Sequence, residues 1–149
     1  MSNLLKYCAI VKMLPVIFIA LCSSFVVYGH NAKQEHLESW GSLLKQNLHG
    51  CISETKVNEE DVSSIDRFLK FPDYRNFKCF TKCIVKRLQL LDDNGDFMET
   101  KIKANVRGID EQVYAKCYLK ASYETDLCDR VYIATQCTAG EILTKLAKN

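Results

Sequence analysis

The chain has 149 residues, 48% of them hydrophobic, and its 20 Lys and Arg residues against 18 Asp and Glu residues give a formal net charge of +2. A chain of this length is expected to form one domain that is large enough to bury a hydrophobic core. Because the charges are nearly balanced, the composition does not indicate a polyanionic partner, and we expect no nucleic-acid binding.

The first 29 residues have the layout of a secretory signal peptide. Two lysines, Lys6 and Lys12, precede an uncharged and mainly apolar stretch over residues 13–27, and small residues follow near Gly29. This stretch is shorter than the roughly 20 residues of a membrane-spanning helix, so we expect a cleaved leader over 1–29 and no membrane anchor. The mature domain then covers residues 30–149, with 18 basic residues (20 minus two) against 18 acidic ones.

The first part of the mature chain predicts two amphipathic helices. Apolar residues follow spacings of three and four over residues 37–51, which indicates the inward face of a first helix. A second helix is expected to begin at Asn58, which resembles the start of a capping box with Asp61, and to end before Pro72.

The third predicted helix has the clearest pattern. Its apolar face consists of residues three or four apart: Phe80, Ile84, Leu88 and Leu91. A separate stripe contains Lys78, Lys82 and Lys86. Because no aromatic residues alternate with these lysines, we interpret the stripe as a solvated helix face and not as a track for nucleic acid.

An acidic turn over residues 92–96 follows this helix and invites comparison with a calcium-binding loop. Counting from Asp92, the sixth position is Phe97, where an EF-hand has glycine, and the twelfth is Lys103, where it has a bidentate glutamate. Zinc is also not indicated, because the chain has no C-x2-C pair and its three histidines all lie near the N-terminus. We therefore expect a polar turn, no metal site and no cofactor.

Three further helices complete an expected all-α domain of about six helices. A short fourth helix carries apolar residues over 97–106 and ends near Gly108, and Asp110 is a candidate N-cap of the fifth. The sixth is predicted from Leu127 to about Ala139.

Cysteine usage is the most specific feature of the sequence. Two of the eight cysteines lie in the predicted leader, and six remain: Cys51, Cys79, Cys83, Cys117, Cys128 and Cys137. In an exported chain an even number of cysteines predicts disulfides, here three. Six cysteines allow 15 pairings, and excluding Cys79 with Cys83, one helical turn apart, leaves 12. Cys128 and Cys137 lie on opposite sides of the sixth helix, so this helix can be joined to two neighbours.

The spacing Cys51-x27-Cys79-x3-Cys83-x33-Cys117-x10-Cys128-x8-Cys137 resembles the six-cysteine signature of insect odorant-binding proteins. The x3 and x8 gaps match that signature fully, while x33 lies at its short end. Segments 77–80 and 90–97, on either side of the third helix, are also similar to family segments. The resemblance implies a single helical domain around an apolar cavity, with interlocked bridges Cys51–Cys83, Cys79–Cys128 and Cys117–Cys137.

The resemblance also implies a function. It predicts a secreted, non-enzymatic carrier of small hydrophobic molecules such as odorants or pheromones, acting as a monomer or weak homodimer, with a membrane odorant receptor as a second candidate partner. No G-x-S-x-G or H-E-x-x-H motif appears in the mature chain. Two alternatives remain open: a carrier or scavenger of lipid or amine mediators in non-olfactory secretions, and a secreted helical interaction module that uses its surface. A large dry cavity favours a carrier, whereas a solid core with an exposed apolar patch favours a module.

Candidate ligand contacts are residues on the predicted inward faces and on the C-terminal tail. They are Trp40, Leu44, Leu48, Phe68, Phe80, Ile84, Leu88, Ile102, Val106, Tyr114, Tyr118, Tyr132, Ile133, Leu143 and Leu146. The three tyrosines are the candidates for a hydrogen bond to an alcohol, aldehyde or ester, because a buried phenol needs a partner. Since Gly140 is a natural end for the sixth helix, we expect the short apolar face of the tail to cover the cavity mouth as a lid.

Overall fold

The computed structural model describes residues 32–62 and 71–148. Within these ranges the regular structure is helical, and an isolated antiparallel bridge between Leu91 and Phe97 is the β-type pairing that accompanies it. The predicted all-α class is therefore confirmed. The predicted leader over residues 1–29 and the candidate contact Phe68 lie outside the described residues.

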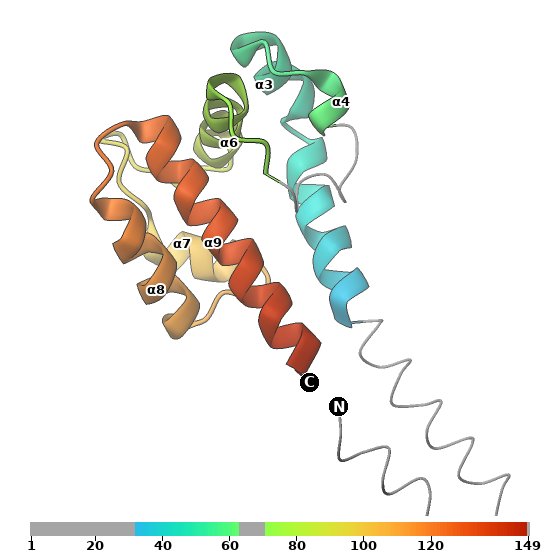
Figure 1. The fold of residues 1–149 in the computed structure, drawn as a ribbon, viewed down its shortest axis with the longest axis vertical. Helices are drawn as coiled ribbons and strands as arrows, with labels where there is room; N and C mark the ends of the chain where they lie inside the picture. Colours follow the sequence, from blue (N-terminus) through green and yellow to red (C-terminus); the bar gives the residue numbers. More distant parts are fainter. Residues whose placement is uncertain (1–31, 63–70, 149) are drawn as a thin grey trace, which may run out of the picture.

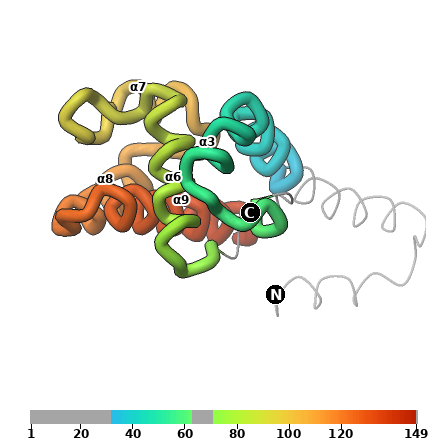
Figure 2. The backbone as a smooth tube through the Cα atoms, turned by 90° about the horizontal axis from the view of Figure 1, so that it is seen from above, coloured from blue at the N-terminus to red at the C-terminus, as the bar shows by residue number. Residues whose placement is uncertain are grey.

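The described ranges contain the following helices. In chain order they are a helix over 32–45, then α3 (Leu48–Thr55), α4 (Glu59–Val62), α6 (Arg75–Arg87), α7 (Glu99–Asn105), α8 (Glu111–Ser122) and α9 (Leu127–Lys148). Figure 1 shows the long α9 beside α6 and α8, and α3 beside α6 on its other side. Seen from above, α6 crosses over α9 instead of running parallel to it (Figure 2).

The first predicted helix is interrupted. Residues 46–47 form a turn, and the backbone N–H of Asn47 donates to the carbonyl of Leu44 over 3.1 Å. Asparagine has a low helix propensity, which accords with a break at this position. The expected continuous face over residues 37–51 is therefore divided between two helices, and Cys51 belongs to the second of them, α3.

The start of α4 differs in detail from the predicted capping box. The Asn58 side chain does cap it, because its Oδ1 accepts from the N–H of Glu60 over 2.9 Å. However, the Asn58 N–H donates to the hydroxyl of Tyr74 over 3.3 Å, and that hydroxyl donates to Asp61 over 2.8 Å. Tyr74 therefore replaces the reciprocal bond expected from Asp61 and ties α4 to the start of α6.

Three disulfides join helices that are distant in sequence. Cys51–Cys83 links α3 to α6, Cys79–Cys128 links α6 to α9, and Cys117–Cys137 links α8 to α9. This is the pairing that the resemblance implies. The bridges span 32, 49 and 20 residues, and crosslinks of such lengths each stabilise the fold by about 3 to 4 kcal/mol by chain-entropy arguments. Because α6 and α9 each carry two of these cysteines, the two helices connect the whole set.

Many of the buried side chains belong to two clusters. One is centred on Phe77 and Phe80, both fully buried, and the other contains Ile102, Val113 and Ile142. Together the two clusters bury the apolar faces of α3, α6, α7, α8 and α9. This packing holds the helices that form the walls of the site described below.

The last helix is longer than predicted. α9 continues through Gly140 to Lys148, so the expected end near Ala139 is wrong. A glycine inside a helix costs only about 1 kcal/mol relative to alanine, whereas Ile142, 2% exposed, is buried in the second cluster. Ion pairs of Lys145 with Asp110 and of Glu141 with Lys116 join the same segment to α8. Although α9 has 22 residues, neither it nor any other helix of the described ranges is long and apolar enough to cross a membrane.

Candidate functional site

A cavity of about 140 Å³ lies between the helix over 32–45, α6, α7 and α9. The described residues that line it are Leu37, Trp40, Leu43, Leu44, Phe71, Phe80, Thr81, Ile84, Val85, Leu88, Leu90, Phe97, Ile102, Val106, Tyr118, Thr135, Thr138 and Ala139. None of these side chains is charged. An engineered apolar cavity of about 150 Å³ stays dry and takes up benzene in another protein. This cavity is therefore large enough for a molecule built on one six-membered ring.

The helix over 32–45 forms one wall and is held by contacts with the segment after α7. The indole N–H of Trp40 donates to the carbonyl of Arg107 over 3.1 Å, and the Arg107 side chain forms an ion pair with Glu35. The His36 ring meets the Trp40 ring edge-on, with ring centroids 6.1 Å apart. Because its N–H is already bonded, Trp40 presents an apolar ring to the cavity.

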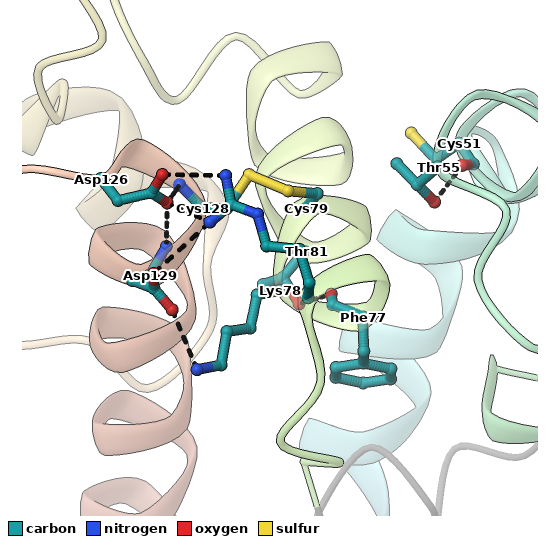
Figure 3. Close-up of a disulfide and its surroundings, with 10 residues drawn as sticks. Cys51, Thr55, Phe77, Lys78, Cys79, Thr81, Asp126, Cys128 and Asp129 are labelled. Atoms are coloured by element: carbon teal, nitrogen blue, oxygen red, sulfur yellow. Dashed lines mark hydrogen bonds and ion pairs between the residues drawn. A yellow bond between two sulfur atoms is a disulfide. The ribbon is translucent and has the colours of Figure 1, made fainter.

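The opposite wall is braced where α6 meets α9. Figure 3 shows the Cys79–Cys128 disulfide beside the carboxylates of Asp126 and Asp129. The Arg75 guanidinium holds Asp126 through two bonds of 2.7 and 2.8 Å, and Asp126 also caps α9 by accepting from the N–H groups of Cys128 and Asp129. The bond from Arg75 is the main cause that lowers the pKa of the Asp126 carboxyl well below its usual range.

A second ion-pair group lies next to the first. Lys78 lies 2.7 Å from Asp73 and 2.9 Å from Asp129, and these hydrogen bonds raise the pKa of the Lys78 ammonium above its usual value. The prediction of a simply solvated lysine stripe is therefore wrong at Lys78, which joins α6 to α9 (Figure 3). Lys86, further along the stripe, is exposed.

Eight of the fifteen sequence-predicted contact residues line the cavity. They are Trp40, Leu44, Phe80, Ile84, Leu88, Ile102, Val106 and Tyr118. They come from four different parts of the chain, and the fold brings them together because α6 and α7 carry their apolar faces toward the helix over 32–45. Phe80, Ile84 and Ile102 are almost fully buried, with 0%, 3% and 1% exposure.

Six of the remaining predicted residues lie elsewhere. Leu48 and Ile133 pack against the first core cluster, and Tyr114 and Leu146 pack against the second. Leu143 is half-buried and, like Leu146, does not line the cavity, so the tail is part of a packed helix and not a flap over the mouth. Tyr132 is buried, but its hydroxyl donates to the carbonyl of Phe71 over 2.6 Å and thus already has a partner.

Ten lining residues were not among the sequence-predicted contacts. They are Leu37, Leu43, Phe71, Thr81, Val85, Leu90, Phe97, Thr135, Thr138 and Ala139. Leu37 lay on a predicted inward face, so the helical pattern could have supplied it. The three threonines could not be found in this way, because a search for apolar periodicity passes over polar residues.

The hydroxyl groups of the lining differ in their hydrogen bonding. Thr81 donates to the carbonyl of Phe77 over 3.1 Å, and Thr135 donates to the carbonyl of Val131 over 2.8 Å. By contrast, the buried Oγ1 of Thr138 has no hydrogen-bond partner among the described residues. Among the described lining residues, the Thr138 hydroxyl is therefore buried without a full hydrogen bond.

Tyr118 lies close to this hydroxyl. Burial raises the pKa of Tyr118 to about 12, and an interaction with the Thr138 side chain, too loose for a full hydrogen bond, partly offsets the rise. The Tyr118 ring stacks on Tyr114, with centroids 4.4 Å apart, and meets Phe97 edge-on at 4.6 Å. The phenol is thus held in one orientation and remains a protonated hydrogen-bond donor at physiological pH.

Comparison with known proteins gives two findings. Residues 33–141 match the PBP/GOBP family. General odorant-binding protein 19d of Drosophila melanogaster is 23% identical over 129 residues, which cover 80% of this chain and 85% of that protein. No solved structure matches the chain. The matched range contains all six cysteines of the three disulfides and every described residue that lines the cavity.

Proposed function

The chain belongs to the PBP/GOBP family, and from this premise we propose that it is a secreted carrier that takes up small hydrophobic molecules in its cavity. The observation that supports this proposal is the uncharged cavity of about 140 Å³ between the helix over 32–45, α6, α7 and α9. Ligand-binding sites are typically apolar hollows with a small number of polar groups, and this cavity has that character.

The crosslinked scaffold is suited to such a cavity. Empty space in a core costs stability, by about 24 cal/mol for each Å³ of cavity in one series of core variants. A cavity of 140 Å³ would thus cost about 3 kcal/mol. Each disulfide offsets a similar amount. The protein can therefore keep space for a ligand and remain folded.

Secretion agrees with the crosslinks. Three disulfides persist in an oxidising compartment and are uncommon in reducing ones. The leader-like sequence over residues 1–29 also supports secretion. As a carrier outside the cell, the protein would move molecules of low water solubility through an aqueous fluid, with the apolar lining replacing the contacts that water cannot offer.

Binding can be followed through Trp40, the one tryptophan in the sequence, because its ring lines the cavity. We expect its emission to change as small apolar volatiles bind with roughly micromolar affinity. Ala139→Leu should weaken binding because the larger side chain fills the cavity that Ala139 lines. Ala147→Leu, the same change at an exposed position of α9, is the control and should bind as the wild type does. If no volatile in a broad panel binds the wild-type protein, the carrier proposal fails.

A further inference from the structure

The proposed carrier function leaves open which chemical class the cavity accepts, and its polar groups bear on that question. The Trp40 N–H and the hydroxyls of Thr81 and Thr135 already donate to backbone carbonyls. Among the described residues, the Thr138 hydroxyl of the lining has no hydrogen-bond partner of full geometry, and the Tyr118 hydroxyl interacts loosely with Thr138 and with no backbone group. An incoming polar atom therefore finds its free partners at one place, where α8 faces α9.

The Thr138 hydroxyl is an exception to the local pattern. The neighbouring α9 threonines, Thr135 and Thr144, donate to the carbonyl four residues earlier, at 2.8 and 2.7 Å. Thr138 is 5% exposed and makes no such bond. A buried polar group without a partner costs free energy. A ligand that supplies the missing bond would recover that cost.

We propose that Tyr118 and Thr138 form the polar end of the cavity and select small uncharged ligands that carry one oxygen, either an alcohol or a carbonyl compound. This inference rests on the proposed carrier function. Two hydroxyls can both donate to a carbonyl oxygen, or one can donate to an alcohol while the other accepts from it. Either arrangement satisfies both protein groups at once.

The charge and the size of the cavity lining narrow the class of ligands further. No charged side chain is among the described residues that line the cavity. A carboxylate or ammonium group would therefore lose its hydration without gaining an ion pair. The volume of about 140 Å³ matches a single ring with a short substituent. Cyclohexanol meets these requirements, whereas methylcyclohexane has the same shape but no oxygen, and cyclohexanecarboxylate carries a charge.

The test compares variants of the secreted, disulfide-bonded protein by titration of Trp40 emission. Thr138→Val keeps the shape of the side chain and removes the hydroxyl, so we expect its affinity for cyclohexanol to fall by about fivefold, the effect of one hydrogen bond. Its affinity for methylcyclohexane should stay the same or rise. The wild type and each variant are compared for one ligand at a time, so the difference in water solubility between the two compounds does not affect the comparison.

Each substitution has a matched control. Thr135→Val removes a lining hydroxyl that is already bonded within α9, so its effect should be equal for the two ligands. Tyr118→Phe should weaken binding of cyclohexanol selectively, whereas Tyr114→Phe, in the ring stacked on Tyr118 but outside the lining, should not. Thr138→Val should also raise the melting temperature, because it removes an unpartnered buried hydroxyl.

The outcomes separate this inference from the carrier function. If the wild-type protein binds other volatiles of the panel but neither cyclohexanol nor methylcyclohexane, the carrier function stands and the proposed ligand class is rejected. If it binds no member of the panel, the carrier function itself fails. If both bind and Thr138→Val changes both affinities by the same factor, or changes neither, the carrier function stands and the polar end is rejected. Binding of cyclohexanecarboxylate at pH 7 as tight as that of cyclohexanol would likewise overturn the selection for uncharged ligands.

Discussion

Replacing Ile142 with alanine tests whether the C-terminal segment is part of the folded core or a movable cover. The side chain is 2% exposed and packs with Ile102, Ile109 and Val113 in the second core cluster. Shortening a buried isoleucine to alanine removes apolar contacts and leaves a cavity, which together cost about 2 to 5 kcal/mol. For a domain of this size, a loss of 3 kcal/mol lowers the melting temperature by about 10 °C.

The assay is urea unfolding of the oxidised protein, followed by far-ultraviolet circular dichroism. Leu143→Ala is the matched control, because the neighbouring Leu143 is half-buried and lies in neither core cluster. It should cost less than about 1 kcal/mol. Because Ile142 does not line the cavity, ligand affinity of the folded Ile142→Ala protein should equal that of the wild type. The reasoning is refuted if Ile142→Ala unfolds at the wild-type urea concentration while its ligand leaves faster, which is the behaviour of a lid.

Three other predictions concern charge, backbone and thiols. Asp126→Asn keeps a capping side chain and loses the charge that faces Arg75. Because folding lowers the pKa of Asp126, its charge contributes stability above the unfolded value of about 4 and this contribution is lost as pH falls toward the folded value. The urea midpoints of wild type and variant should therefore differ at pH 7, and the gap should begin to narrow as pH falls below about 4. A gap independent of pH would contradict the assignment. Gly140→Ala should stabilise the protein by about 0.5 to 1 kcal/mol, because Gly140 lies in a helix with open space around it. Gly108→Ala, at φ +95°, should destabilise the protein by at least about 1 kcal/mol. Thermal melting checks both variants, and equal effects would contradict the described backbone at these glycines. The native protein prepared as residues 30–149 should show no free thiol with a thiol reagent, and peptide mapping should recover the three bridges; two or more reactive thiols would refute them.

Local sequence information was enough for several elements of this fold. The spacing of Phe80 and Ile84 predicts the buried face of α6, and both side chains are buried there. Asp110 was predicted as an N-cap, and its side chain accepts from the N–H of Val113 over 2.9 Å. These predictions are confirmed because helical period and capping depend on residues within one or two turns of each other.

The course of the chain at Gly140 was decided by tertiary contacts, whereas the break at Asn47 accords with local helix propensity. Both residues have low helix propensity, yet the helix stops at the first and continues through the second. The difference lies beyond Gly140, where burial of Ile142 against α7 and α8 outweighs the local cost. The low helix propensity of one residue carries no information about the contacts that the following residues make in the folded protein.

The composition of the cavity wall was also decided by the tertiary structure. Tyr118 and Tyr132 look similar in sequence, as aromatic residues that follow a cysteine of the same helix by one and by four positions. Yet the Tyr132 hydroxyl reaches a carbonyl 61 residues away, while Tyr118 lines the cavity. Periodicity tells which face of a helix turns inward, but whether an inward side chain fills the core or borders the cavity depends on how closely the facing helix approaches. Sequence thus determined the class, the crosslinked character and the inward faces of this protein, and helix packing determined where space for a ligand remains.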